Sequence, residues 1–309
     1  MVTRRSPPTE RVVAVLDFLV AHQGERFGLS ELARRLGLSK PTCLGILTAL
    51  AAGGYLVHDP VTKAYGLGPA LIAAGRVAQN DFAAATLARH RLADLSARYD
   101  TVCTASAVVG ERILVLERTG PARAAARVKV GQTYPFAPPV GLMYVLWGGD
   151  RALDDWLARP PTLPVRSDRA RLRQLAGECR RRGYLVESLT RAGMRLHTLM
   201  AGVAAYDLPD EVRDLVGEVV AGLGERVYLD TELAARKARH PVSLIAAPTF
   251  DADGNQELVL TLYVGAAITG AEIARRGDAL VAAADAVTEQ LSAAPPPPHP
   301  SARRPIDWR

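Results

Sequence analysis

The segment LSELARRLGLSKPTCLGILTALAAGGYLVHDPVTKAYGLG, residues 29–68, decides the fold of the N-terminal quarter of the chain. It opens with a short helix, SELARRLG, for which Ser30 is a candidate N-cap and Gly37 a terminator. A second helix, SKPTCLGILTALAAG, follows with Ser39 as its N-cap and Pro41 in its first turn, where a missing N–H is harmless. Two helices joined by a short glycine-containing turn predict a helix-turn-helix.

The residues on either side of this pair complete a small domain. Upstream, TERVVAVLDFLVAHQG spaces its apolar residues as one face of a helix, with Thr9 able to cap its start and Gly24 its end. Downstream, GYLVHD, the turn PVTK and AYGLG predict a β-hairpin. We therefore predict a winged helix-turn-helix over residues 9–68, preceded by a disordered N-terminus at residues 1–8.

The second helix of the pair has an apolar side and an open side. Cys43, Ile46, Leu47 and Leu50 follow the i, i+3, i+4, i+7 spacing of a buried face. If the helix enters a major groove, the opposite face meets the base edges, and nearby cations suit phosphates. The predicted DNA-binding residues are Arg34, Arg35, Ser39, Lys40, Pro41, Thr42, Leu44, Gly45, Thr48, Lys63 and Tyr65.

Gly45 is unusual because it lies in the middle of this helix. A glycine there costs about 0.5–1 kcal/mol relative to alanine. Two interpretations stay open: a defect tolerated because tertiary packing holds the helix, or a close approach to DNA that a side chain would obstruct. With few hydrogen-bonding side chains on this face, specificity would come from DNA shape, wing contacts, Thr42 and Thr48.

The rest of the chain predicts a linker and a second domain. Residues 69–99 have a helical pattern with a possible break near Asn80, and residues 100–292 mix strands with helices in an α+β order. The expected strands are TVCTASAVV, RILVLERTG, ARVKVG, PVSLIAAPTF and ELVLTLYVG. The expected helices are DRALDDWLA and DRARLRQLAGECRRRG, each opened by an aspartate cap, then EVRDLVGEVVAGLGERV and GAEIARRGDALVAAADAVTEQL. Residues 293–309 form a Pro-rich tail that we expect to be disordered.

One segment of the second domain, VGQTYPFAPPVGLMYVLWGG, gathers aromatic residues around prolines and Gly141, before a predicted apolar helix. Such a loop-to-helix entry can line one wall of a small-molecule pocket, although each of these residues can equally fill the core. The predicted effector-binding residues are Tyr134, Phe136, Pro139, Met143 and Ser243.

Composition and motifs narrow the function classes. The net charge of +6 and the pI of about 9.4 are compatible with nucleic acid, and residues 1–79 hold nine Lys/Arg against five acids. The three cysteines are far apart, which argues against disulfides and against a cysteine zinc site. No signal peptide, spanning segment or catalytic motif stands out, so we expect a cytoplasmic protein that is not an enzyme and needs no cofactor or metal.

At this point the sequence resembles the IclR family of transcriptional regulators. The resemblance lies in the helix-turn-helix, Gly54-Tyr55, the wing from Asp59 to Tyr65 that fits D-P-x-T-x-x-Y, and the exit Leu67-Gly68. VKVGQTYPFAPPVG, RRRGY and AAPTFDADG resemble segments of the family's effector-binding domain. The resemblance covers residues 10–292. It implies a winged helix-turn-helix, a linker helix and a C-terminal mixed sheet with packed helices, a GAF-like effector-binding domain.

The chain departs from the family pattern in two places. Members usually carry an arginine where this chain has Gly45, so no base contact or operator sequence carries over. The gap between Gly183 and Ala246 is longer than is common in the family, which predicts an insertion within residues 189–240. Because part of the effector pocket would be built there, the identity of an effector does not carry over either.

The resemblance implies a bacterial regulator, repressor or activator, that binds a near-palindromic operator in double-stranded DNA and responds to a small-molecule effector. It also implies self-association as a dimer or a dimer of dimers. Three alternatives stay open. The winged helix could dock protein instead of DNA; the chain could be an enzyme or metabolite-binding protein whose N-terminal domain only mediates association; or it could be a nonspecific architectural DNA binder.

Overall fold

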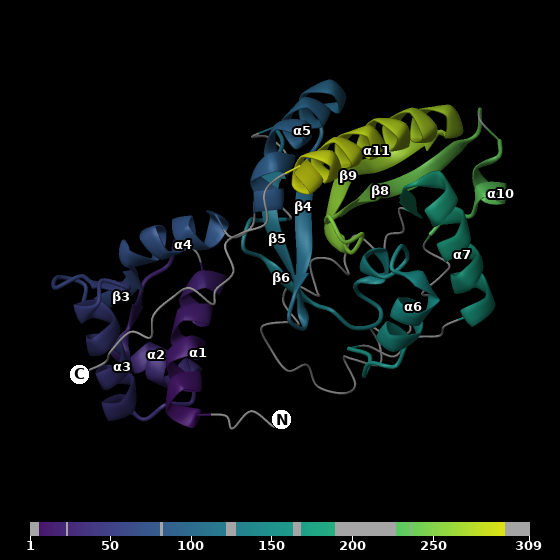
Figure 1. Cartoon of the computed structure of the whole chain (residues 1–309). Helices are drawn as coiled ribbons and strands as arrows, with labels where there is room; N and C mark the ends of the chain where they lie inside the picture. The colour runs from purple at the N-terminus through teal and green to yellow at the C-terminus, as the bar shows by residue number, and fades with distance from the viewer. Residues whose placement is uncertain are drawn as a thin grey trace. The chain divides into compact units, whose positions relative to one another are not determined.

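The computed structural model of the chain describes residues 6–22, 24–80, 83–121, 128–162, 168–188, 227–235 and 237–293. The chain divides into two compact units, Met1–Phe82 and Ala83–Arg309 (Figure 1). Each unit has a hydrophobic core of its own. Within the described segments, we find no helix with the length and apolar character needed to cross a membrane.

The first unit combines helices with a three-stranded sheet. Its elements are α1 (Pro7–Ala21), β1 (Phe27–Gly28), α2 (Leu29–Arg35), α3 (Lys40–Ala52), β2 (Leu56–His58), β3 (Ala64–Leu67) and α4 (Ala70–Asn80). The strand order is β1-β3-β2, and both pairings are antiparallel. The structure thus confirms the helix-turn-helix of α2 and α3 and the hairpin of β2 and β3, which we call the wing.

The core of this unit lies beneath α3. Cys43 and Leu47 are fully buried, and Ile46 and Leu50 pack against them as the spacing predicted. Burying a leucine side chain stabilises the fold by about 1.5–3 kcal/mol, so these contacts fix which side of α3 turns inward. Core packing therefore also determines which residues of α3 lie on the opposite, exposed side.

The capping predictions hold only in part. Ser39 caps α3, because its Oγ accepts the N–H of Thr42 at 3.3 Å. The other two N-caps were wrong: α1 is preceded by Ser6 rather than Thr9, and α2 is preceded by Gly28 with Ser30 inside the helix. α1 can begin at Pro7 because proline fits the first turn, where its missing N–H has no intrahelical acceptor.

The second unit is a six-stranded sheet with helices on both faces. Its elements are α5 (Ala83–Tyr99), β4 (Cys103–Val109), β5 (Arg112–Thr119), β6 (Thr133–Pro135), the 3₁₀ helix η1 (Leu142–Tyr144), α6 (Gly149–Leu157), α7 (Arg169–Arg182), β7 (Leu185–Ser188), α10 (Asp230–Leu233), β8 (Arg239–Phe250), β9 (Gln256–Thr269) and α11 (Gly270–Ala293). The strand order is β6-β5-β4-β9-β8-β7. The α+β class is confirmed, but every described pairing is antiparallel rather than mixed.

The sheet separates two cores. On one face, α5 and α11 pack against residues such as Cys103, Leu260 and Leu262 (Figure 1). On the other face, η1, α6 and α7 pack against Leu244 and Val259. The alternation of β8 and β9 residues between these two cores is what a sheet covered on both faces requires.

Three local predictions in this unit need correction. The expected strand ARVKVG is a turn over its described residues 128–131, where Gly131 has φ +82°, and the edge strand β6 starts two residues later. The expected apolar helix is only η1, and Gly149 begins the next helix with φ +81°. Asp150 lies in the first turn of α6 and does not cap it, whereas Asp168 caps α7 as predicted.

Some predictions lie outside the described residues. These are residues 1–5 of the N-terminus, most of the insertion within 189–240, and the tail from 294 on. Of the helix expected at 211–227, only Val227 is described, and it forms an isolated β-bridge with Glu187. The described part of α1 does include residues 7 and 8, which we had assigned to the disordered N-terminus. The domain boundaries themselves stay a prediction.

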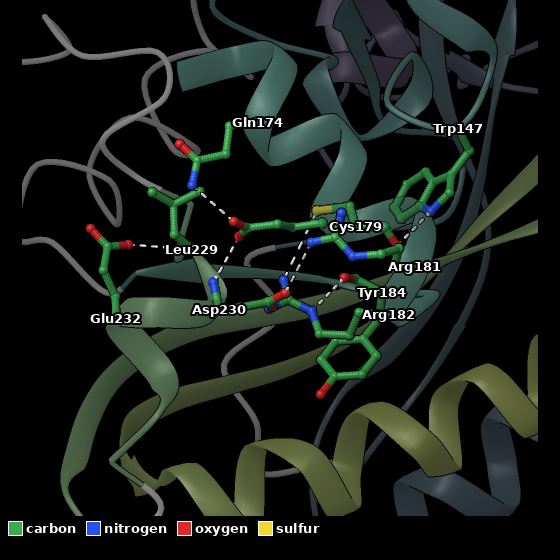
Figure 2. Close-up of polar contacts among 10 residues, drawn as sticks. Trp147, Gln174, Cys179, Arg181, Arg182, Tyr184, Leu229, Asp230 and Glu232 are labelled. Atoms are coloured by element: carbon green, nitrogen blue, oxygen red, sulfur yellow. Dashed lines mark hydrogen bonds and ion pairs between the residues drawn. The ribbon is translucent and has the colours of Figure 1, made fainter. Parts of the chain in front are cut away.

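A buried carboxylate of α7 joins that helix to the start of α10 (Figure 2). Glu178 of α7, 6% exposed, accepts the N–H of Asp230 at 2.7 Å and the amide of Gln174 at 2.9 Å. Arg182 donates to Asp230 at 2.7 Å, and Arg181 lies 3.7 Å from the same carboxylate. Burial raises the pKa of Glu178, but these hydrogen bonds and cations outweigh it, so the pKa is lowered overall.

We expect Glu178→Gln to lower the free energy of unfolding at pH 7 by about 2 kcal/mol, the scale of a hydrogen bond to a charged group. Because the folded-state pKa is lowered, this stabilisation is present above the unfolded-state pKa and is lost as pH falls through the folded-state pKa. Urea unfolding of wild type and variant should therefore converge in acid. Glu289→Gln on the exposed side of α11 is the matched control; an equal loss there, or a pH-independent difference, would contradict this role.

Candidate nucleic-acid interface and effector site

α3 presents one continuous side to solvent. Its exposed residues opposite the core, which we call the open face, are Pro41, Leu44, Gly45, Thr48, Ala49 and Ala52. The side chain of Leu44 is 45% exposed. The face is fixed by the burial of Cys43 and Leu47 and by the cap at Ser39, which sets where the helix begins.

Gly45 lies in the middle of the open face with space around it. A Cβ built there would meet no heavy atom of the chain within 4 Å. The folded domain therefore does not need a glycine at this position for its own packing. If this position requires a glycine, the requirement comes from a binding partner and not from packing within the domain. Both interpretations of Gly45 therefore stay open.

Three exposed cations lie on α2, α3 and the wing of the same unit. Arg34 ends α2, Lys40 begins α3, and Lys63 stands in the turn of the wing, where its φ is +55°. None of the three forms an ion pair with an acidic side chain in the described part of the chain. Cations in these places suit phosphate oxygens, which position a protein on DNA without reading sequence.

Two predicted DNA contacts have partners within the domain. The guanidinium of Arg35 pairs with Glu31 at 2.9 Å and lies over the rings of Phe18 and Phe27, at 5.7 and 5.3 Å from their centroids. Arg35 is nevertheless exposed, so its contact to DNA stays a prediction. Tyr65 is 8% exposed and packs in the core, which argues against a contact from its side chain.

Thr42 and Ser39 share a hydrogen bond between their hydroxyls at 2.8 Å. The Thr42 side chain is half-buried, and its hydroxyl already has a partner at the helix start. Among the predicted threonines, Thr48 is therefore the more accessible to an external partner. The role of Ser39 is clear as a cap, and a contact to DNA from it stays a prediction.

The wing turn is shaped by Asp59. Its Oδ1 accepts the N–H groups of Val61 at 2.9 Å and Thr62 at 3.4 Å. Hydrogen bonds, first from the Thr62 side chain and then from the backbone, lower the pKa of Asp59, and the charge of Arg26 adds to this. Arg26, 3.9 Å from Asp59, is a cation beside the wing that our sequence reasoning missed, because nothing in the sequence links positions so far apart.

The predicted effector residues come together only in part. Tyr134 packs with Ile113 and Val115, and the ring of Phe136 lies 6.3 Å from that of Tyr144. Burial raises the pKa of Tyr134 to about 12. Met143 is half-buried in η1 beside this cluster, and its carbonyl accepts from Gln256 at 3.2 Å.

Pro139 and Ser243 stand apart from the aromatic cluster. Pro139 is half-buried in the loop between β6 and η1, and Ser243 lies at a β-bulge of β8. The residues missed are Ser106, whose hydroxyl meets that of Tyr144 at 2.6 Å, and Tyr263 of β9. Burial raises the pKa of both tyrosines, so their phenols stay neutral hydrogen-bonding groups at neutral pH.

The comparisons with known proteins agree with this architecture. The profile of the IclR helix-turn-helix domain matches residues 8–60. The glycerol operon regulatory protein of Streptomyces griseus is 42% identical over 66 residues, which span 21% of this chain and 26% of that protein. The HTH-type transcriptional regulator XynR of Escherichia coli is 26% identical over 188 residues, 58% of this chain and 73% of that protein. The N-terminal residues 8–60 thus match the IclR helix-turn-helix domain, and the two relatives are transcriptional regulators.

The fold of the whole chain is also that of IclR-type regulators. The crystal structure of an IclR homolog from Microbacterium hydrocarbonoxydans, complexed with 4-hydroxybenzoate, superposes with a TM-score of 0.61 over 93% of this chain and all of that one, at 16% identity. At 16% identity, this structural similarity shows only that the two chains share a fold. No group of three or more His, Cys, Asp or Glu side chains converges as a metal site would within the described residues.

Proposed function

We propose that this chain regulates transcription by binding a specific operator in double-stranded DNA through α3 and the wing. The observation that carries the proposal is the open face of α3 within a helix-turn-helix and wing that also expose the cations Arg34, Lys40 and Lys63. An exposed helix face with cations on the same domain fits a major groove, whose rims are phosphates. Binding rather than catalysis is the proposed activity, and the cytoplasm is its proposed location.

We further propose that two copies of the chain bind a near-palindromic operator. A single helix-turn-helix reads a short half-site, and two-fold symmetry doubles the sequence that is read. The match to the IclR helix-turn-helix domain supports this arrangement. The oligomeric form, a dimer or a dimer of dimers, is measured directly by sedimentation of the protein with and without its operator; a monomer bound to one half-site would contradict it.

The phosphate contacts give the first test. Lys40→Ala should weaken binding to all sequences and reduce the slope of log K against log salt by about 0.9, the value for one phosphate contact on B-DNA. Fluorescence anisotropy over a series of salt concentrations measures this. Lys237→Ala, an exposed lysine of the second unit, should leave the slope unchanged. If Lys40→Ala also left it unchanged, Lys40 would not contact phosphate.

We propose that the second unit binds a small effector beside the aromatic cluster of Tyr134, Phe136 and Tyr144. Apolar rings with a few hydroxyls, here Ser106 and Tyr144, are typical of sites for small, partly apolar molecules. The relative that carries 4-hydroxybenzoate supports this class of ligand and makes that compound the first probe to try.

An effector acts only through its different affinity for the two DNA-binding states. A compound that binds this unit yet leaves operator affinity unchanged would contradict its role as an effector.

A further inference from the structure

The open face of α3 has almost no groups that read bases by hydrogen bonds. Guanine is read mostly by arginine or lysine, adenine by asparagine or glutamine, and cytosine by acidic side chains. Pro41, Leu44, Gly45, Ala49 and Ala52 offer none of these. Thr48, through its hydroxyl, is the only residue of the open face whose side chain can form hydrogen bonds. Most of the open face therefore cannot recognise bases through side-chain hydrogen bonds.

An apolar face can still distinguish bases in the major groove. The C5-methyl group of thymine is the one apolar marker that a base edge displays there. Leu44, with 45% of its side chain exposed, and the methyl of Thr48 lie one helical turn apart on the same side of α3. Both can meet a thymine methyl group by apolar contact.

The small residues between them leave room for a close approach. At Gly45 a Cβ would meet no atom of the domain within 4 Å, and Ala49 and Ala52 add only methyl groups. A face without long side chains lets the helix axis come nearer to the base edges. Leu44 and Thr48 have short side chains, so they reach the floor of the groove only when the helix axis lies this close to the base edges.

The exposed cations of the domain favour DNA over an apolar protein surface as the partner. Lys40 at the start of α3, Arg34 at the end of α2 and Lys63 in the wing are exposed, whereas the open face itself carries no charge. Exposed cations on these elements together with an uncharged helix face suit a groove that has phosphates along its rims and thymine methyls on its floor.

We propose that α3 reads thymine methyl groups, so that the operator half-site is selected by apolar contacts of Leu44 and Thr48 with thymines. This inference rests on the proposed function, since it names what the same surface recognises. It also assigns Gly45 a role: the glycine permits the approach on which these contacts depend.

The test replaces single thymines by deoxyuridine in the operator that the full-length protein selects from random duplexes. This change deletes a methyl group and keeps every hydrogen-bonding atom of the base edge. Each contacted thymine should lose about fourfold in affinity, the value for burying one methylene-sized group. At the contacted positions, Leu44→Ala or Thr48→Ser should make the protein indifferent to the substitution. Val77→Ala in α4, 66% exposed and outside α3 and the wing, should keep the full sensitivity.

The outcomes distinguish a failure of the proposed thymine-methyl recognition from a failure of the proposed function. Affinity unchanged by deoxyuridine at every half-site thymine, or a sensitivity that Leu44→Ala and Thr48→Ser both retain, would overturn the methyl reading while leaving a specific regulator intact. Selection of a half-site without thymine would overturn it as well. Failure to select any sequence would overturn the proposed function first, and this inference with it.

Discussion

Gly45→Glu is expected to lower operator affinity on the order of 100-fold or more, because like charges brought together in an interface cost several kcal/mol. The carboxylate would extend from the open face of α3 toward the phosphates and base edges of the groove. Since a Cβ at this position meets no atom of the chain within 4 Å, the domain itself should fold normally. The loss would therefore report on the DNA contact rather than on folding.

Gly45→Ala provides the matched control for this change. Alanine should stabilise α3 by about 0.5–1 kcal/mol, because it restricts the unfolded chain and fits the space. Circular dichroism and thermal unfolding of both variants, with anisotropy titrations on the selected operator, separate stability from affinity. If Gly45→Glu bound DNA within about threefold of wild type, the open face would not lie in the groove, and the orientation of α3 proposed here would be wrong.

Gly68→Ala is the change with the largest expected effect on stability. A Cβ at position 68 would lie 2.2 Å from the carbonyl oxygen of Gly54 and 2.8 Å from the carbonyl carbon of Tyr55. Both neighbours are backbone atoms, and the N–H of Gly68 already donates to the carbonyl of Tyr55 at 2.8 Å. The chain can relieve the overlap only by separating the exit of β3 from the start of β2. We expect the free energy of unfolding of this unit to fall by about 3 kcal/mol.

Gly75→Ala is the control, because that glycine lies in α4 with no atom within 4 Å of a built Cβ. It should leave stability unchanged or slightly raise it. Urea unfolding followed by circular dichroism measures both variants. A loss below about 1 kcal/mol for Gly68→Ala would mean that the backbone of the wing yields easily. The result also bears on the Leu67-Gly68 exit noted in the sequence, for which the structure supplies this steric reason.

The elements that local chemistry determines could be predicted from the sequence. α3 follows from the cap at Ser39 and the spacing of Cys43 and Leu47, and both features are visible without tertiary context. The long hairpin of β8 and β9 follows from two apolar runs around the turn at Asp253-Gly254. In each case propensity, pattern and turn residues agree with one another, which is the condition for a reliable local prediction.

The predictions that failed depend on contacts between distant residues. Tyr65 was predicted to contact DNA because it flanks the groove helix, but it pairs with Phe27 of β1 and is buried in the core. The valines at 128 and 130 alternate like a strand, yet the turn at Gly131 moves the pairing with β5 on to residues 133–135. No pattern within either segment carries that information.

For the candidate sites too, residues that follow from local periodicity were predicted, and residues brought together by distant contacts were missed. The open face of α3 follows from helical periodicity alone, so Leu44, Gly45 and Thr48 were found. Arg26 was missed because it reaches the wing through the pairing of β1 with β3, a contact that joins residues almost forty positions apart. Ser106 and Tyr263 were missed for the same reason, since only the sheet brings them to Tyr144.

The most direct measurement is a titration of the purified full-length protein on fragmented genomic DNA, with the bound fragments sequenced at two salt concentrations. We expect one or a few symmetric sites to be enriched, with weaker binding at the higher salt because phosphate contacts contribute to affinity. Binding that is uniform over sequence, or absent at low salt, would contradict a sequence-specific regulator.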